Sequence, residues 1–112
     1  MKKQEKNNNL DLEQEIELWK KEYGSVYQTI IADEKIIWRT LKRSEYIKLM
    51  TQEYNENEDL AYFEKQEAAT RMVMLYPKNV DDIIEDFAGI ADIISNECMI
   101  KSGFGSSYTE SL

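Results

Sequence analysis

The first apolar stripe of the chain lies between residues 12 and 23. Its members recur at intervals of four, three and four residues, which is the spacing of one face of an α-helix. Asp11 precedes the stripe, and Gly24 follows it at the place of a left-handed C-cap residue. A helix is therefore predicted from Asp11 to Gly24. The stripe consists of Leu12, Ile16, Trp19 and Tyr23.

The next segment has the composition of β-strands. Residues 26–31 and 36–40 are rich in β-branched and aromatic side chains, and the polar run 33–35 separates them. This pattern predicts a short hairpin near 26–40. Because the segment lacks an Asn-Gly or Asp-Gly pair, we expect a loop of three to five residues.

Helical spacing returns after residue 40. Ser44 is the expected N-cap of a helix, with Glu45 in its first turn. A further helix is predicted from about Glu58 to Pro77, the single proline of the chain, because proline ends a helix. The stripes of these two helices are Tyr46, Leu49, Met50 and Tyr54 in the first, and Ala61, Ala68, Met72 and Leu75 in the second.

The clearest periodic signal lies near the C-terminus. A helix is predicted from about Val80 to Lys101, with Gly103 as its cap. Gly89 lies in the middle and costs about 1 kcal/mol relative to alanine, so a bent helix and two short helices meeting at residues 88–89 both fit. The stripe consists of Ile83, Phe87, Ile90, Ile94 and Cys98.

These elements predict a mainly α fold, a small helical domain of about four helices with a short N-terminal β-hairpin. Residues 1–9 are expected to form a disordered tail, 10–104 a single domain, and 105–112 a flexible tail. The expected buried core consists of Trp19, Leu49, Met72, Leu75, Phe87, Ile90 and Ile94.

The composition of the chain argues against several kinds of site and partner. The 112 residues include no histidine and one cysteine, Cys98, which excludes an internal disulfide, a Cys/His zinc site and a Ser-His-Asp triad. The net charge of −8 disfavours binding to phosphate backbones, so nucleic acid is not an expected partner. The sequence shows neither a membrane-spanning apolar run nor a signal peptide, so no membrane partner is expected and the chain is expected to stay inside the cell that makes it.

Two groups of acidic residues are candidate metal ligands. The run DDIIED at 81–86 places carboxylates four residues apart, but helix starts attract acids for electrostatic reasons alone. Glu64 and Glu67, facing Asp82 and Glu85, resemble the Mg²⁺ site of the all-α nucleoside triphosphate pyrophosphohydrolases, which have E-x-x-D as the second pair. The favoured interpretation is a surface of solvated acids, with no metal, no cofactor and no enzymatic activity.

Four side chains are candidates for contact with a partner protein: Trp38, Met74, Tyr76 and Phe104. Residues 72–104 combine the most apolar run with most of the negative charge. An exposed remnant of Met74, Tyr76 and Phe104 beside an acidic helix would suit a basic amphipathic segment. Trp38 lies within a basic cluster, which we interpret as a solvated face rather than as a nucleic-acid patch.

The order of these features resembles a known family. Residues 36–50 read IIWRTLKRSEYIKLM, residues 72–77 read MVMLYP, and Ala88-Gly89 is followed by a helix that ends in SGF. Over residues 26–104 this is similar to the small baseplate hub assembly proteins of T-even-type tailed phages, which belong with the tail assembly chaperones. Members often carry cysteines before the L-Y-P element, where this chain has Arg71 and methionines.

The resemblance implies a non-enzymatic factor that keeps a tape-measure or baseplate hub protein soluble in the cytoplasm of the infected bacterial host. Two other functions fit the same composition: a structural subunit of the virion baseplate or tail, and an acidic inhibitor that mimics DNA. Self-association into a homo-oligomer is also compatible with the sequence.

Overall fold

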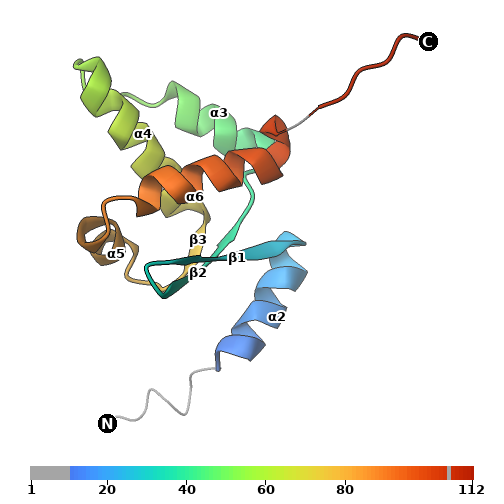
Figure 1. Ribbon diagram of the computed structural model, residues 1–112, viewed down its shortest axis with the longest axis vertical. Helices are drawn as coiled ribbons and strands as arrows, with labels where there is room; N and C mark the ends of the chain where they lie inside the picture. The colour runs from blue at the N-terminus through green and yellow to red at the C-terminus, as the bar shows by residue number, and fades with distance from the viewer. Residues whose placement is uncertain (1–10, 106) are drawn as a thin grey trace.

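The computed structural model describes residues 11–105 and 107–112, so the predicted tail at 1–9 lies outside the described residues. Within them the chain forms five α-helices, one π-helical turn and a three-stranded antiparallel sheet (Figure 1). The expectation of about four helices with a hairpin is therefore wrong. The elements are α2 (Leu12–Tyr23), β1 (Val26–Ile31), β2 (Glu34–Arg39), α3 (Arg43–Thr51), α4 (Glu58–Val73), β3 (Met74–Tyr76), α5 (Val80–Asp86), α6 (Ile90–Met99) and η1 (Ile100–Phe104).

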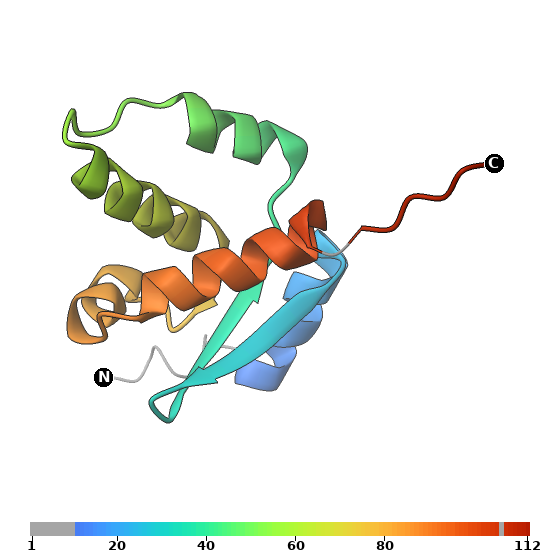
Figure 2. The ribbon, with the colours of Figure 1, turned by 45° about the horizontal axis from the view of Figure 1, so that its top comes forward.

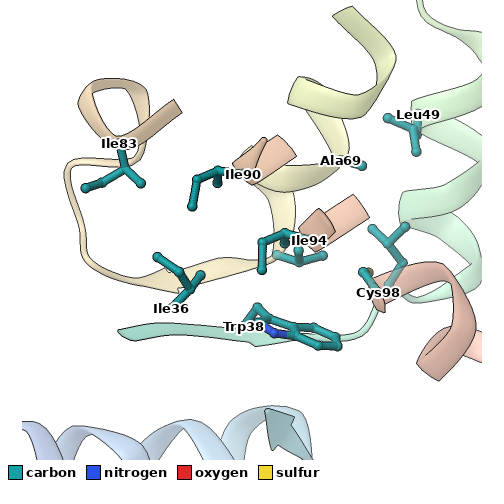
Figure 3. Close-up of a cluster of buried hydrophobic side chains, with 10 residues drawn as sticks. Ile36, Trp38, Leu49, Ala69, Ile83, Ile90, Ile94 and Cys98 are labelled. Atoms are coloured by element: carbon teal, nitrogen blue, oxygen red, sulfur yellow. The ribbon is translucent and has the colours of Figure 1, made fainter. Parts of the chain in front are cut away.

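The sheet lies between helices, because both faces of its central strand, β2, are apolar. Ile36 and Trp38 point to one face, where they join Ile94 and Cys98 of α6 in the core (Figure 3). Ile37 points to the other face and lines a hollow there together with residues of α2 and β1. Side chains of β2 are therefore buried on both sides, as in the central strand of a covered sheet.

The hairpin turn is shorter than the sequence predicts. Ile31 pairs with Glu34, which leaves only Ala32 and Asp33 in the loop. Both residues have positive φ, 50° and 67°, as a type I′ turn requires. The expectation of a longer loop was wrong because it rested on the absence of glycine, whereas here an alanine and an aspartate occupy the left-handed region.

The third strand is a second departure from the sequence pattern. α4 ends at Val73, and residues 74–76 pair with β2 through the registers Ile37 with Tyr76 and Trp38 with Met74. The pairing satisfies backbone groups on the far edge of β2 that would otherwise be buried without partners. Helical spacing had assigned Leu75 to the preceding helix, but the hydrogen bonds of the sheet decide the conformation of this segment.

The ends of α2 and the break between α5 and α6 agree with expectations from the sequence, whereas the start of α3 does not. Asp11 caps α2 by accepting from the backbone N–H of Gln14 (2.9 Å), and Gly24 ends the helix with φ 88°. α5 and α6 are separate helices that meet around residues 87–89, which confirms the second of the two alternatives. α3 begins at Arg43, so Ser44 lies inside its first turn and is not the N-cap.

The core gathers on the α6 side of the sheet. Three of the seven predicted core residues, Leu49, Ile90 and Ile94, are fully buried, whereas Trp19, Met72, Leu75 and Phe87 are only partly buried. The centre is occupied instead by β2, whose Ile36 and Trp38 were not predicted as core. The buried cluster consists of Ile36, Trp38, Leu41, Leu49, Ala69, Val73, Ile83, Ile90, Ile94 and Cys98.

The guanidinium of Arg39, at the end of β2, joins three helices. It binds the Glu45 carboxylate of α3 through two hydrogen bonds of 2.8 and 2.9 Å. The same group donates to the Met72 carbonyl oxygen in the last turn of α4 (2.7 Å) and lies 4.7 Å from the centre of the Tyr23 ring of α2. Glu45 also accepts from the Lys42 backbone N–H (2.9 Å), so one carboxylate both caps α3 and holds Arg39.

The ion pair shifts the pKa values of both Arg39 and Glu45. Hydrogen bonds from Arg39 lower the pKa of Glu45 below its ordinary value of 4.5, although burial acts in the opposite direction. Burial by itself lowers the pKa of Arg39, but the hydrogen bonds and charge of Glu45 outweigh it and the net shift is upward. A carboxyl whose pKa falls on folding stabilises the protein above its ordinary pKa and loses that contribution as the pH drops through the folded value.

Replacing Glu45 with glutamine is expected to lower the free energy of unfolding at pH 7 by about 1.5–3 kcal/mol, because hydrogen bonds to a charged group are lost. Chemical denaturation from pH 7 to pH 3 checks this. Relative to the unchanged protein, the loss of stability below pH 4.5 should be smaller in Glu45→Gln. A double-mutant cycle with Arg39→Met should give a coupling energy that vanishes toward pH 3. An unchanged pH profile in Glu45→Gln would contradict the assignment.

Two neighbouring isoleucines of α6 offer a matched test of the core. Ile90 is 0% exposed and Ile93 is 37% exposed. Ile90→Ala should lower the free energy of unfolding by about 2–5 kcal/mol, because it leaves a cavity. Ile93→Ala should cost about 1 kcal/mol or less. Equal costs, measured by denaturant unfolding, would mean that the buried face of α6 is wrongly placed.

Candidate partner-binding surface

α4 is buried only at its C-terminal end. Its fully buried residues are Ala69, Thr70 and Val73, whereas Leu60, Tyr62 and Phe63 in its first half are exposed. Figure 2 shows α3 and α4 on the side of α6 that faces away from the sheet. The first half of α4 therefore carries three large apolar side chains outside the core. We refer to Leu60, Tyr62 and Phe63 as the α4 apolar cluster.

The aromatic members of the α4 apolar cluster are in contact. The rings of Tyr62 and Phe63 lie edge to face, with centroids 5.8 Å apart. α3 also exposes two apolar side chains, Ile47 and Met50. Exposed large apolar residues thus occur on both helices of the α3–α4 pair, which is typical of a surface that binds another protein.

A hollow of about 150 Å³ opens between α3, α4 and α6, and Tyr62 forms part of its wall. A cavity of this size holds a group as large as benzene, so it can take one apolar side chain of a partner. Leu49 and Ala69 form its floor, since both are buried. The lining residues are Leu49, Tyr62, Lys65, Gln66, Ala69, Ser95, Asn96 and Met99.

The loop between α3 and α4 is fastened to both helices. The Tyr54 hydroxyl donates to the Leu49 carbonyl oxygen, and the Lys65 ammonium lies 5.5 Å from the centre of the Tyr54 ring. The Asn55 backbone N–H donates to a Glu64 carboxylate oxygen (2.8 Å). The Asn57 side chain caps α4 by accepting from the Leu60 N–H (3.1 Å). These bonds hold the α4 apolar cluster in place relative to α3.

Acidic residues flank the α4 apolar cluster along the chain. Residues 53–64 contain five acids and no lysine or arginine, and all five acids are exposed. Lys65 at the rim of the hollow is the nearest basic residue in the sequence. A basic segment would therefore be attracted to this region. The five acids are Glu53, Glu56, Glu58, Asp59 and Glu64.

The sequence-predicted contact residues lie in three different environments. Trp38 is only 1% exposed, with its indole N–H donating to the Thr29 hydroxyl (2.9 Å) and its ring stacked on Tyr27 (4.9 Å), so it belongs to the core. Met74 and Tyr76 are partly buried in β3. Met74 is the register partner of Trp38 and packs against the core, so the structure brings these two together inside the fold.

Phe104 is the predicted contact residue with the most exposed side chain. It lies in η1, and its ring is 4.8 Å from the ring of Tyr46 in α3. The two rings border a hollow of about 190 Å³ that is also lined by Lys42 and Arg43. Phe104 therefore lies on a different element from Met74 and Tyr76 and next to basic rather than acidic side chains.

The predicted carboxylate pairs are engaged in ordinary surface contacts. Glu64 accepts from the loop at Asn55, and Arg71 lies 3.7 Å from Glu67 and 2.6 Å from Asp81. Asp82 and Glu85 are exposed on α5. Over residues 11–105 and 107–112, no three His, Cys, Asp or Glu side chains converge in a way that could hold a metal ion.

Sequence reasoning missed the α4 apolar cluster as a site. Leu60, Tyr62 and Phe63 are not part of the apolar stripe that the sequence predicts for this helix, and they were not named as contact residues. The available signal was that apolar residues occur on more than one face of α4 although half of its residues are polar. A helix of that kind cannot bury all of its apolar side chains against a single neighbouring face.

Comparison of the chain with protein-family models, curated proteins and solved structures finds no match. In the part of the chain that the structure describes, no helix combines the length and the apolar character needed to cross a bilayer.

Proposed function

We propose that the protein is a non-enzymatic assembly chaperone that binds a basic amphipathic segment of a client protein at the α4 apolar cluster. The observation that carries the proposal is the exposure of Leu60, Tyr62 and Phe63 within an acidic segment, with Tyr62 also forming part of the wall of a hollow. Each of these features favours the same kind of partner: an apolar face that covers the cluster and basic residues that pair with the acids.

The apolar side chains and the acidic side chains contribute to binding in different ways. Covering a half-exposed leucine or phenylalanine contributes about 1 kcal/mol or more per side chain, which supplies affinity. The acids speed the encounter with a basic segment and select against acidic ones, and their effect weakens with salt. The complex should therefore weaken as salt rises but persist in part.

The resemblance of residues 26–104 to baseplate hub assembly proteins suggests the client and the setting. The client is a tape-measure or baseplate hub protein of a tailed phage, held soluble in the cytoplasm of the infected bacterium until the tail is built. An exposed apolar cluster on an acidic protein of net charge −8 suits that task, because the charge keeps the complex soluble.

Two double variants provide a matched test of the binding surface. Leu60 and Phe63 are 50% and 55% exposed, and Leu18 and Phe104 have the same two values elsewhere on the molecule. We expect Leu60→Gln with Phe63→Gln to reduce co-purification of the tape-measure or hub protein of the same phage at least tenfold after co-expression. Leu18→Gln with Phe104→Gln should leave it unchanged.

Two outcomes of this co-expression, and one observation on purified phage particles, would contradict the proposal. If neither client becomes more soluble with the unchanged protein, the chaperone function is wrong. If only Leu18→Gln with Phe104→Gln loses the client, the contact lies at the sequence-predicted Phe104. If the protein is found in purified phage particles at fixed stoichiometry, it is a structural subunit.

The proposal also predicts no nucleotide chemistry. Incubation of the purified protein with the common nucleoside triphosphates and Mg²⁺ should release no pyrophosphate, because Glu64 and Glu67 are engaged by Asn55 and Arg71. The matched control is Glu67→Gln. Turnover that this substitution abolishes would favour a pyrophosphohydrolase over the chaperone.

A further inference from the structure

β1 is an outer strand of the sheet. The strand order is β1-β2-β3, so only one edge of β1 is paired. In a two-residue hairpin the residues that flank the loop form a hydrogen-bonded pair, here Ile31 with Glu34. By alternation, Val26, Gln28 and Ile30 direct their backbone N–H and C=O groups away from β2. Among the described residues, no hydrogen bond between backbone groups outside the regular elements involves these three.

α2 packs on the face of the sheet that Ile37 points to, where its Ile16 and Lys20 line a hollow with Val26 and Gln28. Its last residue, Tyr23, lies against Arg39 of β2, with 4.7 Å from the guanidinium to the ring centre. Nearer its start, Glu15 pairs with Lys78 (2.6 Å), which follows β3. α2 therefore lies across this face of the sheet, and in the described part of the chain no backbone hydrogen bond joins α2 to Val26, Gln28 or Ile30.

The edge of β1 carries none of the usual protection against pairing with another strand. Its sequence, VYQTII, has no charged residue and no proline, although the chain as a whole has 36 charged residues among 112. Natural edge strands commonly prevent association by lysine, proline or a bulge. The register of β1 against β2 is regular over all six residues, so a bulge is also missing here.

We propose that the edge of β1 binds the same edge of a second copy of this chain, joining two three-stranded sheets into one. The pairing is antiparallel about a two-fold axis at Gln28, so that Gln28 faces Gln28 and Ile30 faces Val26 of the other copy. In this register the outward-directed backbone N–H and C=O groups of Val26, Gln28 and Ile30 all find partners in the other copy. It also places the exposed Ile30 side chain against an apolar neighbour.

Charge favours this edge over the rest of the surface for self-association. Two chains of net charge −8 repel each other, and β1 is a strand in which no charged side chain adds to the repulsion. At the ends of the register, the turn with Asp33 approaches the last turn of α2 in the other copy, which holds Lys20 and Lys21. Because the contact is one strand wide, the dimer is expected to be weak, in the micromolar to millimolar range.

Engineered cysteines test the register directly. Directly opposed residues in a hydrogen-bonded antiparallel pair have Cα atoms about 5.5 Å apart, within the range of a disulfide. Gln28→Cys should therefore form a disulfide-linked dimer under a glutathione redox buffer. Ile30→Cys is the matched control, because its two copies lie about 14 Å apart in this register, at four strand positions. The native Cys98 does not compete, since it is 0% exposed and burial raises the pKa of its thiol.

Sedimentation of the full chain provides the second measurement. The mass should rise from 13.2 kDa toward twice that value between about 10 μM and about 1 mM. Ile30→Lys should remain monomeric, whereas Leu18→Lys, on α2, should dimerise like the unchanged chain. A monomer at every concentration, a dimer that Ile30→Lys does not weaken, or equal cross-linking of Gln28→Cys and Ile30→Cys would each overturn the proposal. This inference does not depend on the client-binding function.

Discussion

The ion pair between Arg39 and Glu45 is the interaction on which the arrangement of the helices depends. A guanidinium at the end of β2 holds the N-terminal turn of α3 through Glu45 and the C-terminal turn of α4 through the Met72 carbonyl oxygen. It also rests on Tyr23 at the end of α2. The charge is tolerated in this partly buried position because the Glu45 carboxylate and the Thr40 and Met72 carbonyl oxygens accept from the two terminal nitrogens, whereas the buried Nε atom has no protein partner in the described part of the chain.

This attachment explains why one end of the α3–α4 pair is free to bind. α3 leaves the Arg39 region and α4 returns to it, so the loop at 52–57 and the first half of α4 lie far from the fastened ends. Leu49 and Ala69 pack in the core between them, but Leu60, Tyr62 and Phe63 lie beyond it. For the proposed client, a rigid base with an exposed apolar cluster would act as a pre-organised surface and lower the entropic cost of binding.

Local patterns in the sequence predicted α2, the hairpin and the start of α4, because caps and periodicity determine them, and they left the break between α5 and α6 as one of two alternatives. The predictions from local patterns were wrong where pairing between distant segments determines the conformation. Residues 74–76 form a strand because they pair with β2. Ala32 and Asp33 form a two-residue turn because the register of the hairpin leaves only these two residues in the loop. Trp38 was predicted as a partner contact, whereas it is buried in the core with Ile94 and Cys98 of α6. The exposure of Leu60 and Phe63 depends on where α4 crosses α6, which periodicity alone does not specify.

Hydrogen exchange of backbone amides, with and without the tape-measure or hub protein, tests the central claim most directly. Binding at the α4 apolar cluster should slow exchange in the loop and helix around residues 52–66, and leave β3 and η1 unchanged. Protection confined to residues 74–76 or 100–104 would place the client at the sequence-predicted residues instead. No protection anywhere on the chain would contradict the chaperone function.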